Sequence, residues 1–133
     1  IGGVFIVIGG VAGAAPISNW LTQFSAPVAA RPNANPIAAT ADSIEIGSLI
    51  YQQHCATCHG PTGAGNGPQA AALNPRPADL RVHLAPGLHT DEQLYSWLTT
   101  GISNTAMPAF AGTLSEEQRW HVINYIRTLA IRQ

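Results

Sequence analysis

The chain has 133 residues, the length of at most one ordinary domain, and a formal net charge of −1 with only 10% charged residues. It contains six arginines and no lysine, so it lacks the basic patch that nucleic-acid binding requires. Ten prolines and thirteen glycines imply long irregular stretches, and a small domain with many loops has a thin apolar core.

The first stretch, residues 1–17, carries no charge and reads IGGVFIVIGGVAGAAPI. At about 1.5 Å per residue, a helix over it is about 25 Å long, slightly short of the bilayer core. A signal peptide is the alternative, with Ala12, Gly13 and Ala14 as a small-residue cleavage site. We expect a retained transmembrane anchor over residues 1–21, which makes the lipid bilayer a partner.

Residues 22–41 are rich in proline and alanine, and this composition predicts an extended linker. The globular part is expected over residues 42–133. It begins with a helix for which Asp42 and Glu45 form a capping box. Ile46, Leu49 and Ile50 follow at helical spacing and predict an apolar stripe on that helix.

Cysteines occur only in the run Cys55-Ala-Thr-Cys58-His59, which has the pattern C-x-x-C-H. Two thiols at this spacing can each add to one of the two vinyl groups on a haem edge, and the histidine can bind the iron from one face. A zinc site would need further cysteines, and a redox dithiol would need a βαβ pattern. The motif therefore predicts one covalently attached haem c.

After the motif comes a loop over residues 60–77 that is rich in glycine and proline and lacks periodicity. A helix is predicted over residues 91–100, with Thr90 and Gln93 as its capping box and Gly101 as its stop. A last helix is capped by Ser115 and Gln118. The apolar faces of these two helices are formed by Leu94, Trp97 and Leu98, and by Trp120, Ile123, Ile126 and Leu129.

Met107 is the only methionine in the chain and is expected to be the second axial ligand of the haem iron. Ligation by histidine and methionine raises the reduction potential and suits electron transfer. The alternatives are His83 and His89, either of which would give a haem with two histidine ligands. His54 is too close to the motif in sequence to reach the opposite face, and His121 is expected on the solvent side of the last helix.

From Asp42 to Arg132 the chain resembles class I cytochromes c, the single-haem electron carriers. The resemblance rests on the haem motif, on Met107 and its following proline, and on a first helix and a last helix that would cross near Gly47, where Tyr51 is the aromatic partner. It implies an all-α fold of three to five helices around the haem.

The resemblance also implies roles for residues outside the motif. In the family a loop proline accepts a hydrogen bond from the iron-binding histidine through its carbonyl group, and Pro68 is the best match. Arg76 or Arg81 would pair with a haem propionate. The lysine ring through which some family members dock has no counterpart here.

Residues 73–80 and 105–110 are similar to those of the mono-haem cytochrome subunit of alternative complex III, a quinol-oxidising assembly. This resemblance implies an electron-transfer subunit of a respiratory or photosynthetic complex and not an enzyme in its own right. Its partners would be the other subunits and redox donor and acceptor proteins. It would be anchored in the cytoplasmic membrane, with the haem domain on the periplasmic side. A free-standing anchored carrier and an open-site haem sensor or enzyme are the alternatives.

Overall fold

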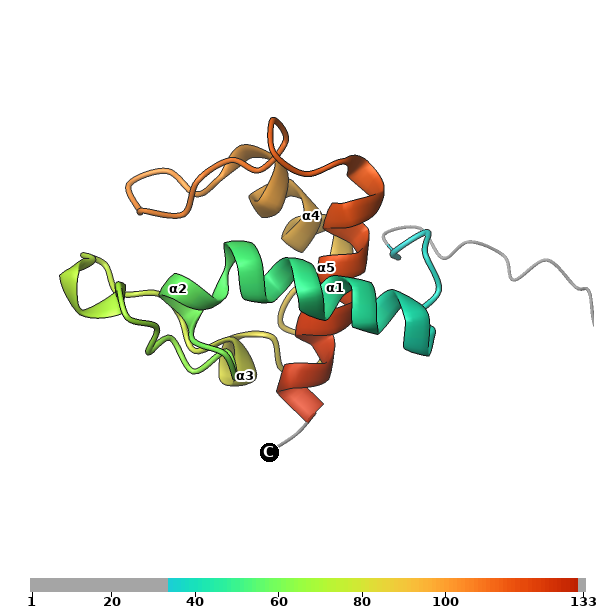
Figure 1. The fold of residues 1–133 in the computed structure, drawn as a ribbon, viewed down its shortest axis with the longest axis horizontal. Helices are drawn as coiled ribbons and strands as arrows, with labels where there is room; N and C mark the ends of the chain where they lie inside the picture. Colours follow the sequence, from blue (N-terminus) through green and yellow to red (C-terminus); the bar gives the residue numbers. More distant parts are fainter. Residues whose placement is uncertain (1–33, 132–133) are drawn as a thin grey trace, which may run out of the picture.

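The computed structural model describes residues 34–131, and all regular structure within them is helical. In chain order the elements are α1 (Ala41–His54), α2 (Ala56–His59), the 3-10 turn η2 (Ala70–Ala72), α3 (Leu80–His83), α4 (Asp91–Thr100) and α5 (Glu116–Ile131). Figure 1 shows α1 crossing α5 at the centre, with α4 on one side of α1, α3 on the other and α2 following the end of α1. The expected all-α fold is confirmed for this part of the chain.

The expected anchor, residues 1–21, and most of the expected linker lie outside the described residues. Across residues 34–131 there is no helix with both the length and the apolar character needed to cross a bilayer.

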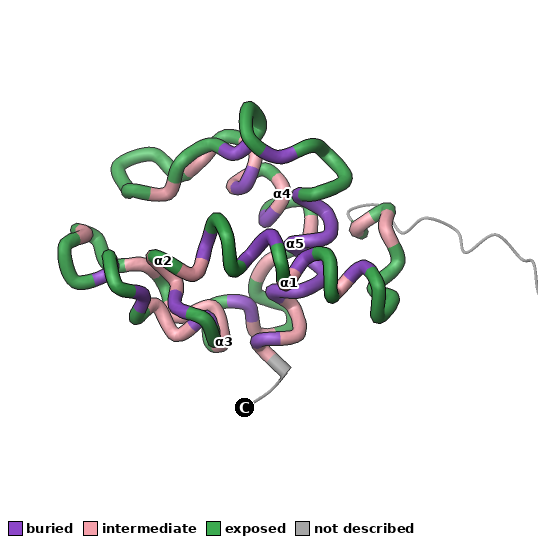
Figure 2. Tube along the Cα trace, in the orientation of Figure 1, coloured by how far each residue is buried: buried purple, intermediate pink, exposed green. Residues whose placement is uncertain are grey.

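The crossing of α1 and α5 depends on Gly47, as expected. A Cβ atom at this position would overlap the backbone carbonyl oxygen of His121, so only glycine allows the two helices to come this close. One turn later the rings of Tyr51 and Tyr125 pack with their centroids 5.2 Å apart. Burial is concentrated along α5 (Figure 2), so this helix is the core against which the other helices pack.

The start of α1 differs from the prediction. Thr40, which has an extended backbone, caps the helix by accepting a hydrogen bond from the Ser43 amide, so Asp42 and Glu45 are not a capping box. The expected stripe is also wrong in part, because Ile46 and Leu49 are 43% and 62% exposed. Helix α5 covers a different face of α1, formed by Ser43, Gly47, Ile50 and Tyr51.

The two later helices begin where the sequence predicts. Thr90 and Gln93 exchange side-chain to backbone hydrogen bonds of 3.2 and 2.9 Å at the start of α4, and Gly101 ends that helix with a φ of 72°. Ser115 and Gln118 exchange the same pair of bonds before α5. The expected inward residues are buried, except Trp97, which is partly exposed and lies against a cavity.

The segment before α1 is fixed on the domain and is not a free linker in its last residues. The Asn35 side-chain amide donates to the Trp120 carbonyl and to the Asn124 side chain, both at 2.9 Å. In return the Asn124 amide donates to the Ile37 carbonyl at 3.0 Å. The folded domain therefore begins at about Asn35, several residues earlier than expected.

The expectation that His121 faces solvent is wrong. Its side chain is buried, and its Nδ1 lies 2.8 Å from the Ser43 hydroxyl oxygen, which also accepts a hydrogen bond from Asn124. Its Nε2 lies 3.7 Å from the carboxylate of Glu117, one turn earlier on α5, so only the Nδ1 edge of the ring has its partner inside the domain.

Candidate haem-binding site

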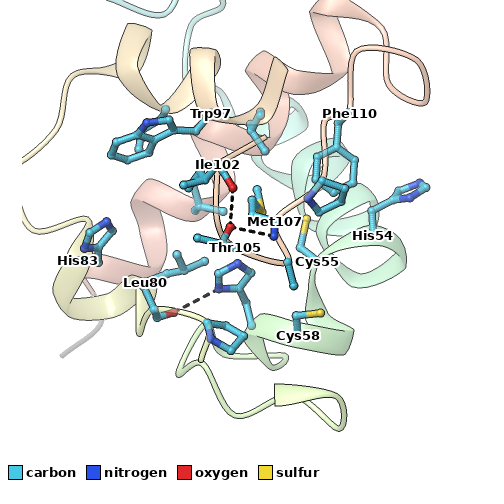
Figure 3. A pocket seen from close by; sticks show the side chains of 18 of the residues that line it. His54, Cys55, Cys58, Leu80, His83, Trp97, Ile102, Thr105, Met107 and Phe110 are labelled. Carbon is cyan, nitrogen blue, oxygen red and sulfur yellow. Dashed lines mark hydrogen bonds between the residues drawn. The ribbon is translucent and has the colours of Figure 1, made fainter. Parts of the chain in front are cut away.

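The C-x-x-C-H motif lies where α1 passes into α2. Cys55 ends α1, with its amide donating to the Tyr51 carbonyl at 2.8 Å, and the His59 amide donates to the Cys55 carbonyl at 2.9 Å. These bonds hold the two thiols and the imidazole on adjacent helical turns. Cys55, Cys58 and His59 all line one cavity of about 240 Å³ (Figure 3).

The wall of this cavity is mainly apolar. It is formed by residues from all five α-helices and from the loop before α5. Its largest apolar groups include Leu80, Leu84, Leu94, Leu98, Phe110 and Ile126. An apolar chamber that also presents two thiols and an imidazole matches the chemistry of a porphyrin, which is a large apolar ring with reactive vinyl groups and a metal at its centre. The residues present therefore fit a covalently bound haem.

Both thiols are free, as thioether formation requires. Cys55 is buried, and this burial raises the pKa of its thiol to about 12. Cys58 is more exposed and lies 3.7 Å from the side-chain oxygen of Gln69. The two cysteines are therefore presented from the wall and from the rim of the same cavity.

His59 is held as a neutral imidazole with a defined tautomer. Its Nδ1 lies 3.2 Å from the Ala78 carbonyl oxygen, and because a carbonyl only accepts, Nδ1 carries the proton. Burial lowers the pKa of the ring, and the Ala78 hydrogen bond opposes this shift only in part. The second nitrogen, Nε2, is then left with its lone pair available for iron.

The carbonyl that orients His59 was expected from Pro68 and comes instead from Ala78, directly after Pro77. Pro68 is exposed and does not line the cavity. Its neighbours Gly67 and Gln69 donate to the Cys58 and Thr57 carbonyls at 3.1 and 3.0 Å. These bonds hold Pro68 against the backbone of α2. The group that reaches the His59 imidazole is the Ala78 carbonyl, farther along the same connection.

Met107 is brought to the same cavity by a short loop pinned to the end of α4. The Met107 amide donates to the Thr105 hydroxyl at 3.1 Å, and that hydroxyl donates to the Ile102 carbonyl at 2.8 Å (Figure 3). The Ile102 amide in turn donates to the Met107 carbonyl at 3.2 Å. The structure thus collects Cys55, Cys58, His59 and Met107 around one space.

The two alternative histidine ligands are placed differently. His83, at the end of α3, lines the cavity near its edge, whereas His89 does not line it (Figure 3). His54 also borders the cavity, although its ring points outward in this view. Of the two alternatives to Met107, His83 alone is among the residues that line the cavity, and the choice of the second ligand stays a prediction.

The two candidate arginines have different surroundings in the structure. Arg76 lines the cavity and is exposed to solvent, so it remains available to a propionate. Arg81 does not line the cavity and instead forms a two-pronged ion pair with Asp79, at 2.9 and 2.6 Å. This hydrogen bonding lowers the pKa of the Asp79 carboxyl group. The pairing of Arg76 or Arg81 with a propionate stays a prediction.

Two site residues were missed at the sequence level. The Ala78 carbonyl is a backbone group and has no side-chain signal, although the proline at position 77 marks a stiff turn just before it. The sequence predicts Trp97 on the buried apolar face of its helix, and in the structure this side chain forms part of the cavity wall.

Comparisons with known proteins agree with this geometry. The family profile described as cytochrome c oxidase, cbb3-type, subunit III matches residues 42–126. Among solved structures, the chain is similar to a chain of the reducing HAO-like protein complex of Kuenenia stuttgartiensis, with 28% sequence identity and a TM-score of 0.62. This similarity covers 81% of the chain and 53% of that chain, so the present chain spans about half its length. No curated protein matches the sequence.

Proposed function

The chain belongs to the family described as cytochrome c oxidase, cbb3-type, subunit III, and on that premise we propose that it transfers electrons as a membrane-anchored subunit of a larger complex, with His59 and Met107 as axial ligands. As a mono-haem cytochrome c it carries a covalently bound c-type haem. That haem supplies a one-electron couple between ferrous and ferric iron. The observation that carries the proposal is the meeting of Cys55, Cys58, His59 and Met107 at one apolar cavity.

The four residues perform three tasks. Cys55 and Cys58 fix the haem to the chain by thioether bonds, so it is not lost in either redox state. His59, with its proton held on Nδ1 by Ala78, presents Nε2. Met107 presents a soft thioether sulfur on a loop tied to α4. Leu94, Leu98 and Phe110 exclude water from the space between them.

The ligand assignment is tested by the weak far-red absorption band that ferric iron shows when bonded to thioether sulfur. We expect this band in the wild type and expect it to disappear in Met107→Ala. His83→Ala is the matched control, because His83 lines the same cavity, and it should keep the band. If the wild type lacks the band and the haem spectrum changes in His83→Ala, the second axial ligand is His83 and not Met107. Tight binding of carbon monoxide by the wild type would favour an open-site sensor or enzyme instead.

The membrane assignment rests on the uncharged sequence of residues 1–17 and on a head that begins only about 14 residues after position 21. We place the haem domain on the periplasmic side of the cytoplasmic membrane. The resemblance of residues 73–80 and 105–110 to the alternative complex III subunit favours a quinol-oxidising complex. The charge of −1 and the absence of lysine favour partners held by shape and apolar contact over lysine-directed docking.

Purification in mild detergent separates a complex subunit from a free-standing carrier. A subunit should leave the membrane together with other redox polypeptides and remain with them through size-exclusion chromatography. A chain that is extracted alone, with its haem intact, would identify an independent anchored carrier. Accessibility of the haem domain to protease in spheroplasts tests its side of the membrane.

A further inference from the structure

Outside the haem ligands, two histidines meet at one edge of the domain. His83 ends α3 and His89 lies just before α4, and their ring centroids are 4.7 Å apart with the planes inclined at 45°. Trp97 packs against both rings, with centroid distances of 6.1 and 4.8 Å. Within residues 34–131 neither ring makes a hydrogen bond, so no ring nitrogen of the pair is committed to a protein partner.

The backbone around both histidines is fixed. The His83 amide donates to the Asp79 carbonyl at 2.9 Å and so closes α3. A turn at Gly87, which has a φ of 87°, reverses the chain and brings His89 back over His83. The His89 carbonyl then accepts a hydrogen bond of 2.6 Å from the Arg127 guanidinium. The pair is therefore held together by contacts that do not involve the imidazoles themselves.

The spacing of the rings suits two imidazoles that share one metal ion. With metal–nitrogen distances of about 2 Å and an angle of about 90–110° at the ion, the two ring centroids lie about 5 Å apart. The observed separation is 4.7 Å. We propose that His83 and His89 form an exchangeable site for a divalent late first-row transition ion, with Cu²⁺ bound more tightly than Zn²⁺.

The surrounding charges allow a cation to bind here. Arg127, which bonds to the His89 carbonyl, is paired with Asp91 at 2.7 Å, and Arg81, two residues before His83, is paired with Asp79 at 2.6 Å. No group of three or more histidine, cysteine or acidic residues with metal-site geometry exists in the part of the chain that the structure describes. Two protein ligands leave the remaining positions to water, so the site exchanges its ion readily. Because His83 and Trp97 line the haem cavity, the ion would add positive charge at the edge of that cavity.

The test is titration of the full-length holoprotein with Zn²⁺ by isothermal calorimetry. We expect one ion per chain, and we expect the affinity to fall in both His83→Ala and His89→Ala. Since loss of an outer-shell partner alone lowers metal affinity about 10–100-fold, loss of a ligand should cost at least tenfold. His54→Ala is the matched control, because it removes an exposed histidine that borders the same cavity, and it should bind as the wild type does.

Electron paramagnetic resonance of the Cu²⁺-loaded protein gives a second readout that does not depend on affinity. Splitting from two equatorial nitrogens is expected in the wild type and from one in each single variant. Wild-type binding no tighter than that of a His83→Ala/His89→Ala double variant, an equal loss in His54→Ala, or a copper signal without nitrogen splitting would each overturn the proposal. Unchanged far-UV circular dichroism and haem absorption in the variants exclude misfolding as the cause of a loss.

Discussion

At the scale of single residues, the crossing of α1 and α5 depends on a residue without a side chain. Gly47 lies against the His121 carbonyl, where a Cβ atom would overlap it. We predict that Gly47→Ala pushes α1 away from α5 and lowers the free energy of unfolding by about 1–3 kcal/mol or more. Guanidinium unfolding of the holoprotein measures this loss.

Gly112→Ala is the control for that experiment, because a Cβ at Gly112 would have no atom within 4 Å. It should leave the unfolding midpoint nearly unchanged. Equal effects of the two substitutions would mean that helix propensity or unfolded-state entropy, and not the α1–α5 contact, sets the stability change.

A buried hydroxyl ties the first helix to the end of the haem motif. The Tyr51 hydroxyl donates to the Gly60 carbonyl at 2.7 Å, and the Tyr51 side chain is completely buried. Tyr51→Phe leaves that carbonyl without its partner, which we predict to cost about 1–3 kcal/mol. Tyr125→Phe, in the ring that packs against Tyr51, removes a hydroxyl without a hydrogen bond among residues 34–131 and should cost less. Comparable losses in thermal unfolding of the two variants would argue against this role.

At the scale of elements, Arg127 joins α5 to the segment between α3 and α4. Its guanidinium donates to the Asp91 carboxylate at 2.9 and 2.7 Å and to the His89 carbonyl at 2.6 Å. About a quarter of the Arg127 side chain and about a quarter of the Asp91 side chain are exposed. Arg127→Lys keeps the charge but loses this fork of donors. We predict a loss of about 1–3 kcal/mol in stability and faster amide hydrogen exchange over residues 84–91.

Arg81→Lys is the matched comparison, because the Arg81–Asp79 pair is more exposed, with side-chain exposures of 42% and 32%. Exposed ion pairs add little to stability, because solvent screens the attraction between the charges. Hydrogen exchange over residues 84–91 should therefore stay close to that of the wild type. If Arg81→Lys raised hydrogen exchange over residues 84–91 as much as Arg127→Lys does, the hydrogen bonds of Arg127 would not be what holds this segment in place.

At the scale of the whole molecule, part of the buried apolar core is also the wall of the haem cavity. This wall includes apolar side chains from α3, α4 and α5 together with the motif residues of α1 and α2. We predict that a Cys55→Ser/Cys58→Ser variant produced without attached haem loses much of its helical signal in far-UV circular dichroism. A haem-free chain with the helical content and cooperative melting of the holoprotein would contradict this expectation.

Much of this architecture is predictable from the sequence because its signals are local. The C-x-x-C-H spacing identifies the haem attachment site, and the caps at Thr90 and Ser115 mark two helix starts to the residue. Met107 is a candidate ligand because it is the only methionine in the chain. Each of these inferences depends on residues within a few positions of one another or on composition.

The remaining features are set by contacts between residues far apart in the sequence. The burial of His121 depends on Ser43, and the docking of Asn35 depends on Asn124. The orientation of His59 depends on a backbone carbonyl at Ala78. No periodicity or motif marks these partners, because a backbone carbonyl carries no side-chain signal and a polar residue on a helix reads as solvent-facing until its neighbours are known.

The central claim is that one haem is joined covalently to this chain at the C-x-x-C-H motif that contains Cys55 and Cys58. The most direct measurement is the intact mass of the polypeptide after extraction with acidified acetone, which removes non-covalently bound haem. We predict the mass of the chain plus one haem, with the pigment remaining on the protein. A bare polypeptide mass, with the colour in the organic phase, would contradict it.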